Sequence, residues 1–558
     1  MPFLIHGRWK MNLLHKFLDR TEFSDYDDFK KNCQLKVPEK FNFAYDVIDE
    51  YARLAPEKRA ILWCNDKGEE KTITFKQLSD MSKKLANVFK NHGINKGDIV
   101  MTMLNRRWEY WVTVIACHRA GIVVIPATFM LKSHDIEYRV KGAGAKCIIA
   151  TNEDAVIVNV DETKPLLNKD MIYFSTTKRD GYFCLDEEME EASDDFGFVE
   201  TDLNDESMVY FTSGTTGYPK MVAHNFLYPL GFIYNAVYWH KVIDDGLHFT
   251  SSESGWAKCS WGKLYGQWIA GACLFIYDYL HKFHPTDLLE RIEKYHIDTF
   301  CAPPTIYRFL IKEDLSKYDL SSLSHCSTAG EALNAEVWKQ FYKATGQKIY
   351  EGYGQSESSI ILGTFGMMDI RIGSMGKPSP LYDLHLVDDK MNDVQPGVVG
   401  EIVIKIKHPQ CSLVFKYHNS PELTKERLGD GYHHTGDLAY YDEDGYFWFV
   451  GRTDDVIKSS GYRIGPFEVE SALMEHPAVL ECAITGVPDP QRGQVVKATI
   501  VLAKGFEPSD ELIKELQNHV KTTTAPYKYP RIVEFVKELP KTVSGKIKRA
   551  EIRKNDSK

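Results

Sequence analysis

The sequence predicts an α/β fold with a large N-terminal domain of mostly parallel sheets flanked by helices, a small β-rich subdomain and a small α+β domain at the C-terminus. Two observations predict this fold. Short apolar, β-rich runs alternate with helical patterns over most of the chain, and 558 residues exceed one ordinary domain. Because parallel strands are joined by crossovers that are usually helices, this alternation predicts sheets covered on both faces.

The first half of the chain supplies most of this alternation. A helix is expected at Thr74–His92, which the chain enters through Thr74, and the acidic, aperiodic stretch Asp180–Asp205 is expected to be a surface loop. The other elements expected here are strands at Arg59–Cys64, Asp98–Leu104, Ile122–Pro126, Cys147–Ala150 and Ala272–Ile276, and helices at Ala44–Leu54, Trp108–Ala120, Ser133–Lys141 and Pro285–Tyr295.

The second half contains two regions of different character. Val399–Lys407 is expected to be a strand of the β-rich subdomain, which runs to about Val450. After Gly451–Asp455 the alternation of helical and strand patterns begins again. The restart predicts helices at Pro466–His476 and Asp510–Thr522, and strands at Val479–Gly486, Val495–Leu502 and Arg531–Val536. We therefore expect one domain over residues 1–452 and a second over residues 453–558.

Composition narrows the function classes. The formal charge of -10 argues against nucleic acid as a partner, because binding a phosphate backbone needs a basic surface. The 11 cysteines form no C-x-x-C pair, which favours reduced thiols over disulfides or a zinc site. The N-terminus lacks the apolar core of a secretory signal, and no run approaches the roughly 18 apolar residues of a spanning helix. These features predict a cytoplasmic protein without a membrane span, and they leave its oligomeric state open.

The most informative segment follows the expected strand Met208–Thr212. Its glycines let backbone N–H groups approach an anion, its hydroxyls donate further hydrogen bonds and its lysine supplies a positive charge, so the loop is suited to phosphate. It differs from a Walker P-loop, because a proline separates the last glycine from the lysine; an ordinary polar turn is the competing interpretation. The loop consists of Thr212, Ser213, Gly214, Thr215, Thr216, Gly217, Tyr218, Pro219 and Lys220.

With this loop the chain resembles the adenylate-forming, or acyl-activating, enzyme superfamily. Further motifs follow in that family's order: Thr328-Ala-Gly330-Glu331-Ala332, Tyr353-Gly-Gln-Ser-Glu357, His434-Thr-Gly-Asp437, Gly451-Arg452-Thr-Asp454-Asp455, Ser460-Gly461-Tyr-Arg463-Ile464 and Pro540-Lys-Thr-Val-Ser-Gly-Lys546. The segments Thr524–Arg531 and Ser460–Glu470 are most similar to the medium-chain acyl-CoA synthetase branch. The resemblance implies a ligase that converts a carboxylic acid and Mg-ATP into an acyl-adenylate and then passes the acyl group to coenzyme A.

The resemblance also implies a nucleotide site. Glu357 would hold Mg²⁺, which prefers carboxylate oxygen, Tyr353 would offer a ring to adenine, and Asp437 and Arg452 would meet the ribose. The implied ATP- and AMP-binding residues are the loop 212–220 together with Gly330, Glu331, Glu351, Gly352, Tyr353, Gly354, Gln355, Ser356, Asp437, Arg452 and Lys546.

The resemblance further implies that the two half-reactions take place in two different orientations of the C-terminal domain. Lys546 would stabilise the charge of the first step, with Lys220 and Arg463 as further catalytic cations. Asp454 matches the family's hinge, about which a mobile C-terminal domain rotates. The residues implied to contact CoA are Ser460, Gly461, Tyr462, Arg492, Tyr529, Pro530 and Arg531.

The acyl pocket is expected around Gly354, Ser356, Trp256, Trp261 and Arg463. Acetate-selective relatives carry tryptophan at the position of Gly354, so glycine is expected to leave volume for longer or more branched acids, at about 0.8 kcal/mol per buried methylene. Core packing of the two tryptophans is an equally good interpretation. Lys258, between them in sequence, has no assigned role.

Two other functions stay open at this point. The chain could form adenylates for another acceptor, such as a carrier-protein thiol or an oxygenation like that of luciferase, although it has no fused carrier domain. Alternatively, it could be a nucleotide-binding or regulatory module that kept the fold and lost the chemistry. The presence of Lys546, Glu357 and Asp437 speaks against this second alternative.

Overall fold

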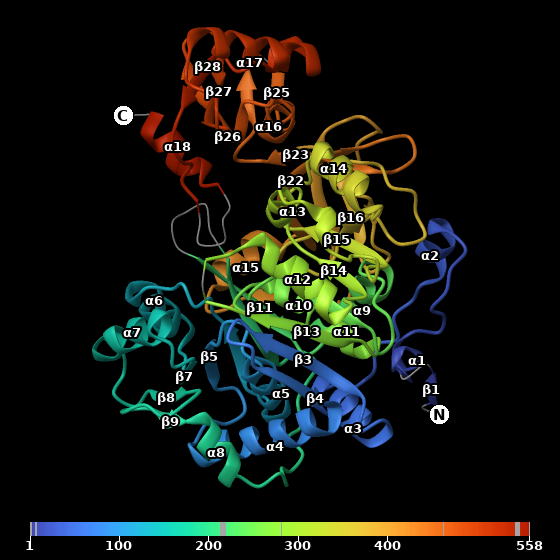
Figure 1. The fold of residues 1–558 in the computed structure, drawn as a ribbon, viewed down its shortest axis with the longest axis vertical. Coiled ribbons are helices and arrows are strands. Elements are labelled where there is room, and N and C mark those ends of the chain that lie inside the picture. Colours follow the sequence, from blue (N-terminus) through green and yellow to red (C-terminus); the bar gives the residue numbers. More distant parts are fainter. Residues whose placement is uncertain are drawn as a thin grey trace.

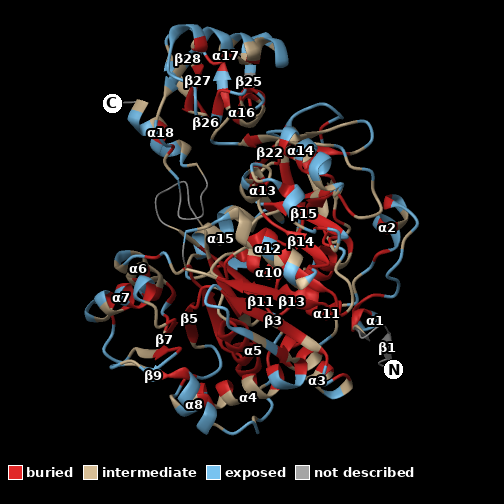
Figure 2. Ribbon diagram, viewed as in Figure 1, coloured by how far each residue is buried: buried red, intermediate tan, exposed pale blue. Residues whose placement is uncertain are grey.

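In this computed structural model, the described residues are 3–5, 8–212, 219–280, 282–460, 462–541 and 547–556. Within these ranges two large sheets form the body of the molecule, and the elements of the C-terminal region lie together at one end of it (Figure 1). Buried residues concentrate in the strands of the two large sheets and exposed residues on the surrounding helices (Figure 2). This is the α/β arrangement that the sequence predicts.

The first large sheet is parallel except at one edge. Antiparallel pairing joins β10 to β11, with Thr212 opposite Lys220, so the two ends of the predicted phosphate loop are held together. The strand order is β21 (Lys416–Tyr417), β11 (Lys220–Asn225), β10 (Glu206–Thr212), β6 (Val123–Pro126), β5 (Ile99–Met103), β7 (Cys147–Ala150), β8 (Ile172–Ser175) and β9 (Phe183–Cys184).

The second large sheet places β15 and β16 side by side and parallel, with Thr328 opposite Glu351. Since both strands end at the same edge, the segments that follow them meet there. The strand order is β18 (Lys377–Pro378), β17 (Leu362–Gly363), β16 (Ile349–Tyr353), β15 (His325–Ala329), β14 (Thr299–Cys301), β12 (Leu247–Thr250), β13 (Cys273–Asp278), β3 (Arg59–Asn65) and β4 (Glu70–Thr74).

Two smaller sheets follow in the chain. An antiparallel sheet, the predicted β-rich subdomain, has the order β19 (Asp383–Val387), β20 (Gly400–Lys405), β22 (Tyr432–Tyr441) and β23 (Phe447–Arg452). The C-terminal sheet has the order β25 (Tyr462–Ile464), β24 (Ile457–Ser459), β27 (Gly493–Leu502) and β26 (Val479–Asp489), with β28 (Ile532–Phe535) paired to β27. The sheet therefore changes between Arg452 and Ile457, next to the predicted hinge residue Asp454; rotation about it stays a prediction.

The expected helices are present with small shifts at their ends. Thr74 caps α4, since its hydroxyl accepts a hydrogen bond from the backbone N–H of Gln77. The helices on the N-terminal and central sheets include α3 (Glu50–Leu54), which continues the π-helix η1 (Ala44–Asp49), α4 (Phe75–Asn91), α5 (Glu109–Ala120), α6 (Ser133–Ala143), α7 (Asp154–Thr163), α9 (Tyr228–Ile233), which runs into the π-helix η3 (Tyr234–Trp239), α10 (Ala257–Gly262), α11 (Tyr265–Ile269), α12 (Pro285–Tyr295), α13 (Pro304–Leu310), α14 (Ala335–Thr345) and α15 (Pro421–Leu428). The C-terminal helices are α16 (Pro466–Met474), α17 (Asp510–Thr523) and α18 (Arg549–Asp556).

One expectation was wrong. The stretch Asp180–Asp205, expected to be a loop throughout, contains β9 and a short helix, α8 (Leu185–Glu191). Leu185 and Met189, four residues apart, are buried side chains of this helix, and the acidic residues around them obscured this spacing in the sequence.

Among all the residues that the structure describes, no helix is long and apolar enough to cross a bilayer.

An ion pair between a buried arginine and a half-buried aspartate ties three helices of the N-terminal region together. The guanidinium of Arg119 in α5 is 1% exposed and donates to both oxygens of Asp49 in η1, at 2.7 and 2.8 Å. Its Nε also donates to the Ser82 hydroxyl of α4 at 3.3 Å.

We expect Asp49→Ala to lower the free energy of unfolding by about 3–5 kcal/mol, because it leaves this guanidinium buried without its carboxylate. The double variant Asp49→Ala/Arg119→Met removes both charges and should recover most of the loss. Urea unfolding followed by circular dichroism measures both; equal losses in the single and double variants would contradict the prediction.

Candidate functional site

Two glycine-containing segments meet at the carboxyl ends of β15 and β16. Gly330 follows β15 with a φ of +102°, a conformation that favours glycine, and Gly354 directly follows β16. Gly352, within β16, lies opposite Ala329. The structure thus brings the predicted residues 330–331 and 351–356 to one edge of the second sheet.

Two carboxylates support this edge. Glu351 is 6% exposed, and its Oε1 accepts a hydrogen bond from the backbone N–H of Leu333 at 3.2 Å, which ties the segment after Gly330 to β16. Burial raises the pKa of Glu351 to about 8. Glu331 accepts hydrogen bonds from the Thr305 hydroxyl at 2.9 Å and from Arg308 at 3.0 Å. Glu351 is therefore fixed by the segment that follows β15, and Glu331 by helix α13.

Asp437, in the middle of β22, joins the third sheet to this edge. Its Oδ2 accepts hydrogen bonds from the Tyr353 hydroxyl at 2.6 Å and from Nε2 of Gln355 at 2.7 Å. Arg452, opposite Asp437 in β23, approaches Oδ1 at 3.4 Å. Asp437 is only 5% exposed, so its negative charge is held by these donors in a partly water-excluded site. Four predicted nucleotide residues meet here.

Lys220 begins β11, beyond the loop. Burial lowers the pKa of its ammonium and the neighbouring Arg427 lowers it further, while the carboxylate of Glu357 opposes them. Burial raises the pKa of Glu357, and Lys220 and Arg452 oppose that effect. The charges of Lys220 and Glu357 therefore act on one another. Ser213, Gly214, Thr215, Thr216, Gly217 and Tyr218 lie outside the described residues.

The structure contradicts the expectation that Gly354 leaves open volume. A Cβ at this position would lie 2.4 Å from Cη2 of Trp261 and 2.5 Å from the carbonyl oxygen of Ser359. Trp261 is 5% exposed, and its Nε1 donates to the Ser358 carbonyl at 3.1 Å. The indole fills the space that the missing side chain leaves, so a Gly354→Trp exchange would collide with it rather than occupy a void.

The other residues of the predicted acyl region lie around α10. Trp256, half-buried, is the residue before its first turn. Lys258 donates from Nζ to the carbonyl oxygen of Ala329 at 2.5 Å, at the end of β15. The backbone of Ser356 accepts a hydrogen bond from His224 at 2.7 Å. Lys258 therefore lies beside the predicted acyl and nucleotide segments, although the sequence assigned it no role.

The predicted CoA residues that the structure describes lie on several elements of the C-terminal region. Arg492 donates to the Ser460 hydroxyl at 3.2 Å, and Tyr462 stacks on Tyr527 with ring centroids 4.1 Å apart. Arg531 donates to the Tyr529 hydroxyl at 2.7 Å, while the adjoining Pro530 is buried. Half of Tyr462 is exposed, so this region offers aromatic and cationic groups to solvent. Gly461, the side chain of Arg463 and Lys546 lie outside the described residues.

Sequence reasoning missed His224. It is fully buried on β11, stacks on Tyr228 at 3.8 Å between ring centroids, and holds the Ser356 carbonyl. The sequence did contain a signal for this residue. Residues four apart on a strand lie on the same face, and His224 follows Lys220 at that spacing.

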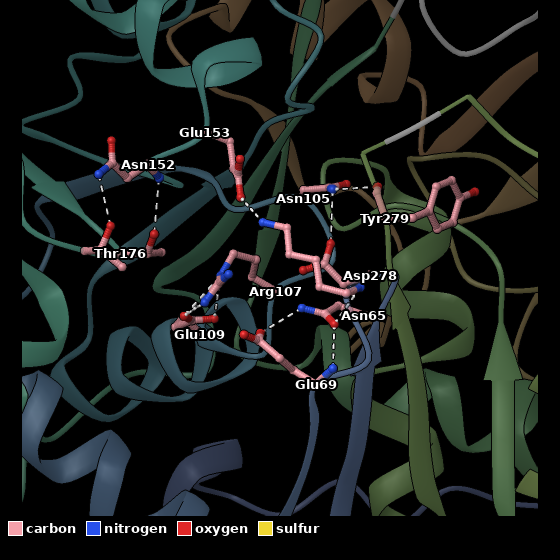
Figure 3. Close-up of polar contacts among 12 residues, drawn as sticks. Asn65, Glu69, Asn105, Arg107, Glu109, Asn152, Glu153, Thr176, Asp278 and Tyr279 are labelled. Carbon is pink, nitrogen blue, oxygen red and sulfur yellow. Dashed lines mark hydrogen bonds and ion pairs between the residues drawn. The ribbon is translucent and has the colours of Figure 1, made fainter.

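A second polar group that was not predicted lies at other strand ends of the two large sheets (Figure 3). Asn105, after β5, donates from Nδ2 to Asp278 at the end of β13 at 3.2 Å, and Arg107 binds Glu109. Burial raises the pKa of Asp278 to about 7. The Asn105 contact crosses between the two sheets, so the group helps to fix how they are placed.

Known proteins match this chain over nearly its full length. A family model described as "AMP-binding enzyme" matches residues 48–411, and one described as "AMP-binding enzyme C-terminal domain" matches residues 468–546. The chain is 44% identical to acyl-coenzyme A synthetase ACSM3, mitochondrial, of Pongo abelii, covering 96% of this chain and 93% of that protein. It is 42% identical to acyl-coenzyme A synthetase ACSM4, mitochondrial, of Homo sapiens, covering 97% and 94%.

Solved structures agree with this match. The anthranilate CoA ligase AuaEII, in complex with anthranoyl-AMP, superposes with a TM-score of 0.84 at 29% identity, covering 93% of this chain and 98% of that one. An acyl-CoA synthetase of Brucella canis gives a TM-score of 0.70 at 30% identity, covering 93% and 94%.

The raised pKa of Glu351 predicts a pH-dependent stability. The folded protein keeps this proton up to about pH 8, whereas the unfolded chain loses it above its ordinary value of 4.5, so stability falls as the pH rises between these values. Glu351→Gln keeps an acceptor for Leu333 and removes the titration. We expect its melting temperature, relative to the wild type, to rise from pH 5 to pH 8; parallel curves would count against the assignment.

Proposed function

Because the chain belongs to the AMP-binding enzyme family, we propose that it is an AMP-forming acid:CoA ligase for a medium-chain or branched carboxylic acid. The observation that carries the proposal is the meeting of three predicted nucleotide segments at one edge: Gly330–Glu331 after β15, Glu351–Gln355 at β16, and Asp437 of β22. The names of the relatives, acyl-coenzyme A synthetases and CoA ligases, support the same activity.

The first half-reaction is an in-line displacement. A carboxylate oxygen of the acid forms a bond to the α-phosphorus of ATP, the bond between that phosphorus and the bridging oxygen breaks, and pyrophosphate leaves with the electron pair. The loop 212–220 would grip the phosphates, with Lys220 as its fixed charge. Asp437, oriented by Tyr353 and Gln355, would accept hydrogen bonds from the ribose, and Arg452 would add a charge-assisted contact.

Glu357 fits a Mg²⁺ ion. Mg²⁺ is commonly bound through one or two carboxylates together with substrate phosphates, and Glu357 is a half-buried carboxylate whose charge reaches Lys220. The ion would supply charge neutralisation of the triphosphate. Glu357 would hold it beside the loop.

The second half-reaction transfers the acyl group. The thiol of CoA loses its proton to water, its sulfur forms a bond to the acyl carbon, the bond from that carbon to the phosphate oxygen breaks, and AMP leaves with the electron pair. We propose that the C-terminal domain rotates at Asp454 between the two steps, which exchanges Lys546 for Gly461 and its neighbours at the acyl-adenylate. Exposed Tyr462, Arg492 and Arg531 would then meet CoA, and Arg463 would face phosphate or carboxylate.

A panel of aliphatic and aromatic acids with ATP and free CoA tests the proposal. AMP and acyl-CoA formed in equal amounts support it. Acid-stimulated ATP–pyrophosphate exchange without acyl-CoA would favour another acceptor, and no exchange with any acid would favour a binding module.

The proposal also concerns the cellular compartment in which the protein works. The sequence predicts the cytoplasm, whereas the printed names of its acyl-coenzyme A synthetase relatives include "mitochondrial". We propose the compartment of these relatives, because they match 96–97% of this chain. Fluorescence of the full chain with a C-terminal tag separates the two locations.

Lys546→Ala should nearly abolish acid-dependent ATP–pyrophosphate exchange yet spare thioester formation from supplied acyl-adenylate, because its charge serves the first step alone. The matched control is Lys548→Ala, since Lys548 lies in the same tail but pairs with Glu551 at 3.5 Å. Loss of both half-reactions in Lys546→Ala would contradict this division of labour.

A further inference from the structure

Helix α15, which follows β21, has an inner and an outer face. The residues of the inner face are half-buried and spaced as one side of a helix: Leu423, Thr424, Arg427 and Leu428. Lys425 and Glu426, between them, are exposed. The Thr424 hydroxyl accepts a hydrogen bond from the backbone N–H of Tyr417 at 2.9 Å, so the inner face lies against β21. Arg427, three residues after Thr424, lies on the same side of the helix.

Strand β21 brings α15 to the predicted phosphate loop. Tyr417 of β21 lies opposite Val222 of β11, and β11 begins at Lys220, the last residue of that loop (Figure 1). Lys220 in turn lies opposite Thr212, where the loop starts. Arg427 therefore belongs to a helix that is fastened, through two strand pairings, to both ends of the loop.

Arg427 and Lys220 place two positive charges close to one another. Burial is the main cause that lowers the pKa of the Lys220 ammonium, and the positive charge of Arg427 is the second. Within the described part of the chain, the buried Nε of Arg427 has no hydrogen-bond partner, and the side chain of its ion-pair neighbour Glu426 is 64% exposed. Two cations that repel one another in a partly buried place favour an anion bound by both.

The same guanidinium is close to the predicted magnesium carboxylate. Burial raises the pKa of the Tyr417 hydroxyl, the carboxylate of Glu357 raises it further, and Arg427 lowers it. The charges of Glu357 and Arg427 therefore both reach Tyr417, so the two side chains belong to one neighbourhood.

The two arginines of the site lie at different ends of it. Arg452 approaches Oδ1 of Asp437 at 3.4 Å, where the ribose is expected. Lys220 is affected more strongly by the charge of Arg427 than by that of Arg452. When the ribose is at Asp437, Arg427 is therefore on the side of the loop, where the phosphates far from the ribose lie.

We propose that Arg427 binds the β- and γ-phosphates of ATP together with Lys220 and stabilises the pyrophosphate that leaves in the first half-reaction. The inference rests on the proposed function, which places the triphosphate at the loop 212–220. As the bond from the α-phosphorus to the bridging oxygen breaks, the electron pair goes to pyrophosphate, and the guanidinium meets the negative charge that develops there. A guanidinium stays protonated and presents a fork of N–H donors that matches phosphate oxygens.

Arg427→Met removes the charge and keeps an apolar stem. In acid-dependent ATP–pyrophosphate exchange, the KM values for ATP and for pyrophosphate should each rise about ten- to a hundred-fold, the range for losing one hydrogen bond to a charged group. Arg427→Lys keeps the charge without the fork, so both KM values should rise by less than in Arg427→Met.

AMP gives the discriminating measurement, because it carries the α-phosphate alone. The Kd for AMP and the rate of thioester formation from supplied acyl-adenylate should stay unchanged in Arg427→Met. A variant that merely disturbs the fold would weaken these two properties as well. Lys425→Met is the matched control, since it removes a positive charge from the exposed face of the same helix and should leave all of these measurements unchanged.

Thermal unfolding gives a readout that needs no turnover. A ligand that binds only the folded protein raises the melting temperature. With Mg²⁺ and inorganic pyrophosphate, the melting temperature of the wild type and of Lys425→Met should rise, and that of Arg427→Met should rise less. With AMP, the three proteins should show the same rise.

The outcomes separate the two levels of inference. No exchange with any acid in the wild type would overturn the proposed ligase itself. Exchange in the wild type, with KM values for ATP and pyrophosphate that Arg427→Met leaves unchanged or with an equal loss of AMP binding, would overturn the role of Arg427 alone. Weaker binding of ATP and pyrophosphate with unchanged binding of AMP supports that role.

Discussion

The candidate site depends on one carboxylate, that of Asp437. Its oxygens accept hydrogen bonds from Tyr353 and Gln355, which lie at the end of a different sheet, and Arg452 approaches it from the neighbouring strand. Charge-assisted hydrogen bonds of this kind are short and directional, so they fix the third sheet against the second. This carboxylate is therefore what joins β22 to the edge at which β15 and β16 end.

Around this contact, glycines decide how closely neighbouring elements approach. Gly352 and Gly354 admit Trp239 and Trp261, and Gly255 admits the backbone of Thr128, whose nitrogen would lie 2.2 Å from a Cβ at 255. Such approaches carry α10 onto the strand ends and hold its side chains at fixed depth. The surroundings of these strand ends are thus set by residues of helical segments that lie far away along the chain.

The sequence predicts what depends on local pattern. Alternating strands and helices are visible in it, as are the motifs that end in Asp437, Arg452 and Glu357, and the described parts of these elements lie within a few residues of the expected ranges. The filled space at Gly354 was not predictable, because a glycine is compatible with an empty pocket and with an intruding ring from residue 261. The contact between Asn105 and Asp278 is a similar case, since its two residues belong to distant segments.

Acidic side chains hold the basic C-terminal tail in place. Arg549 donates to both oxygens of Glu470 in α16 at 2.7 Å, and Arg553 binds Asp455 at 2.5 Å, beside the predicted hinge. Ile552 of the same helix is buried, and Lys541 binds Glu481 at 2.8 Å. The segments on both sides of residues 542–546 are therefore fastened to the C-terminal domain. In the proposed rotation at Asp454, these described parts of the tail would turn together with the C-terminal domain, because their acidic partners belong to it.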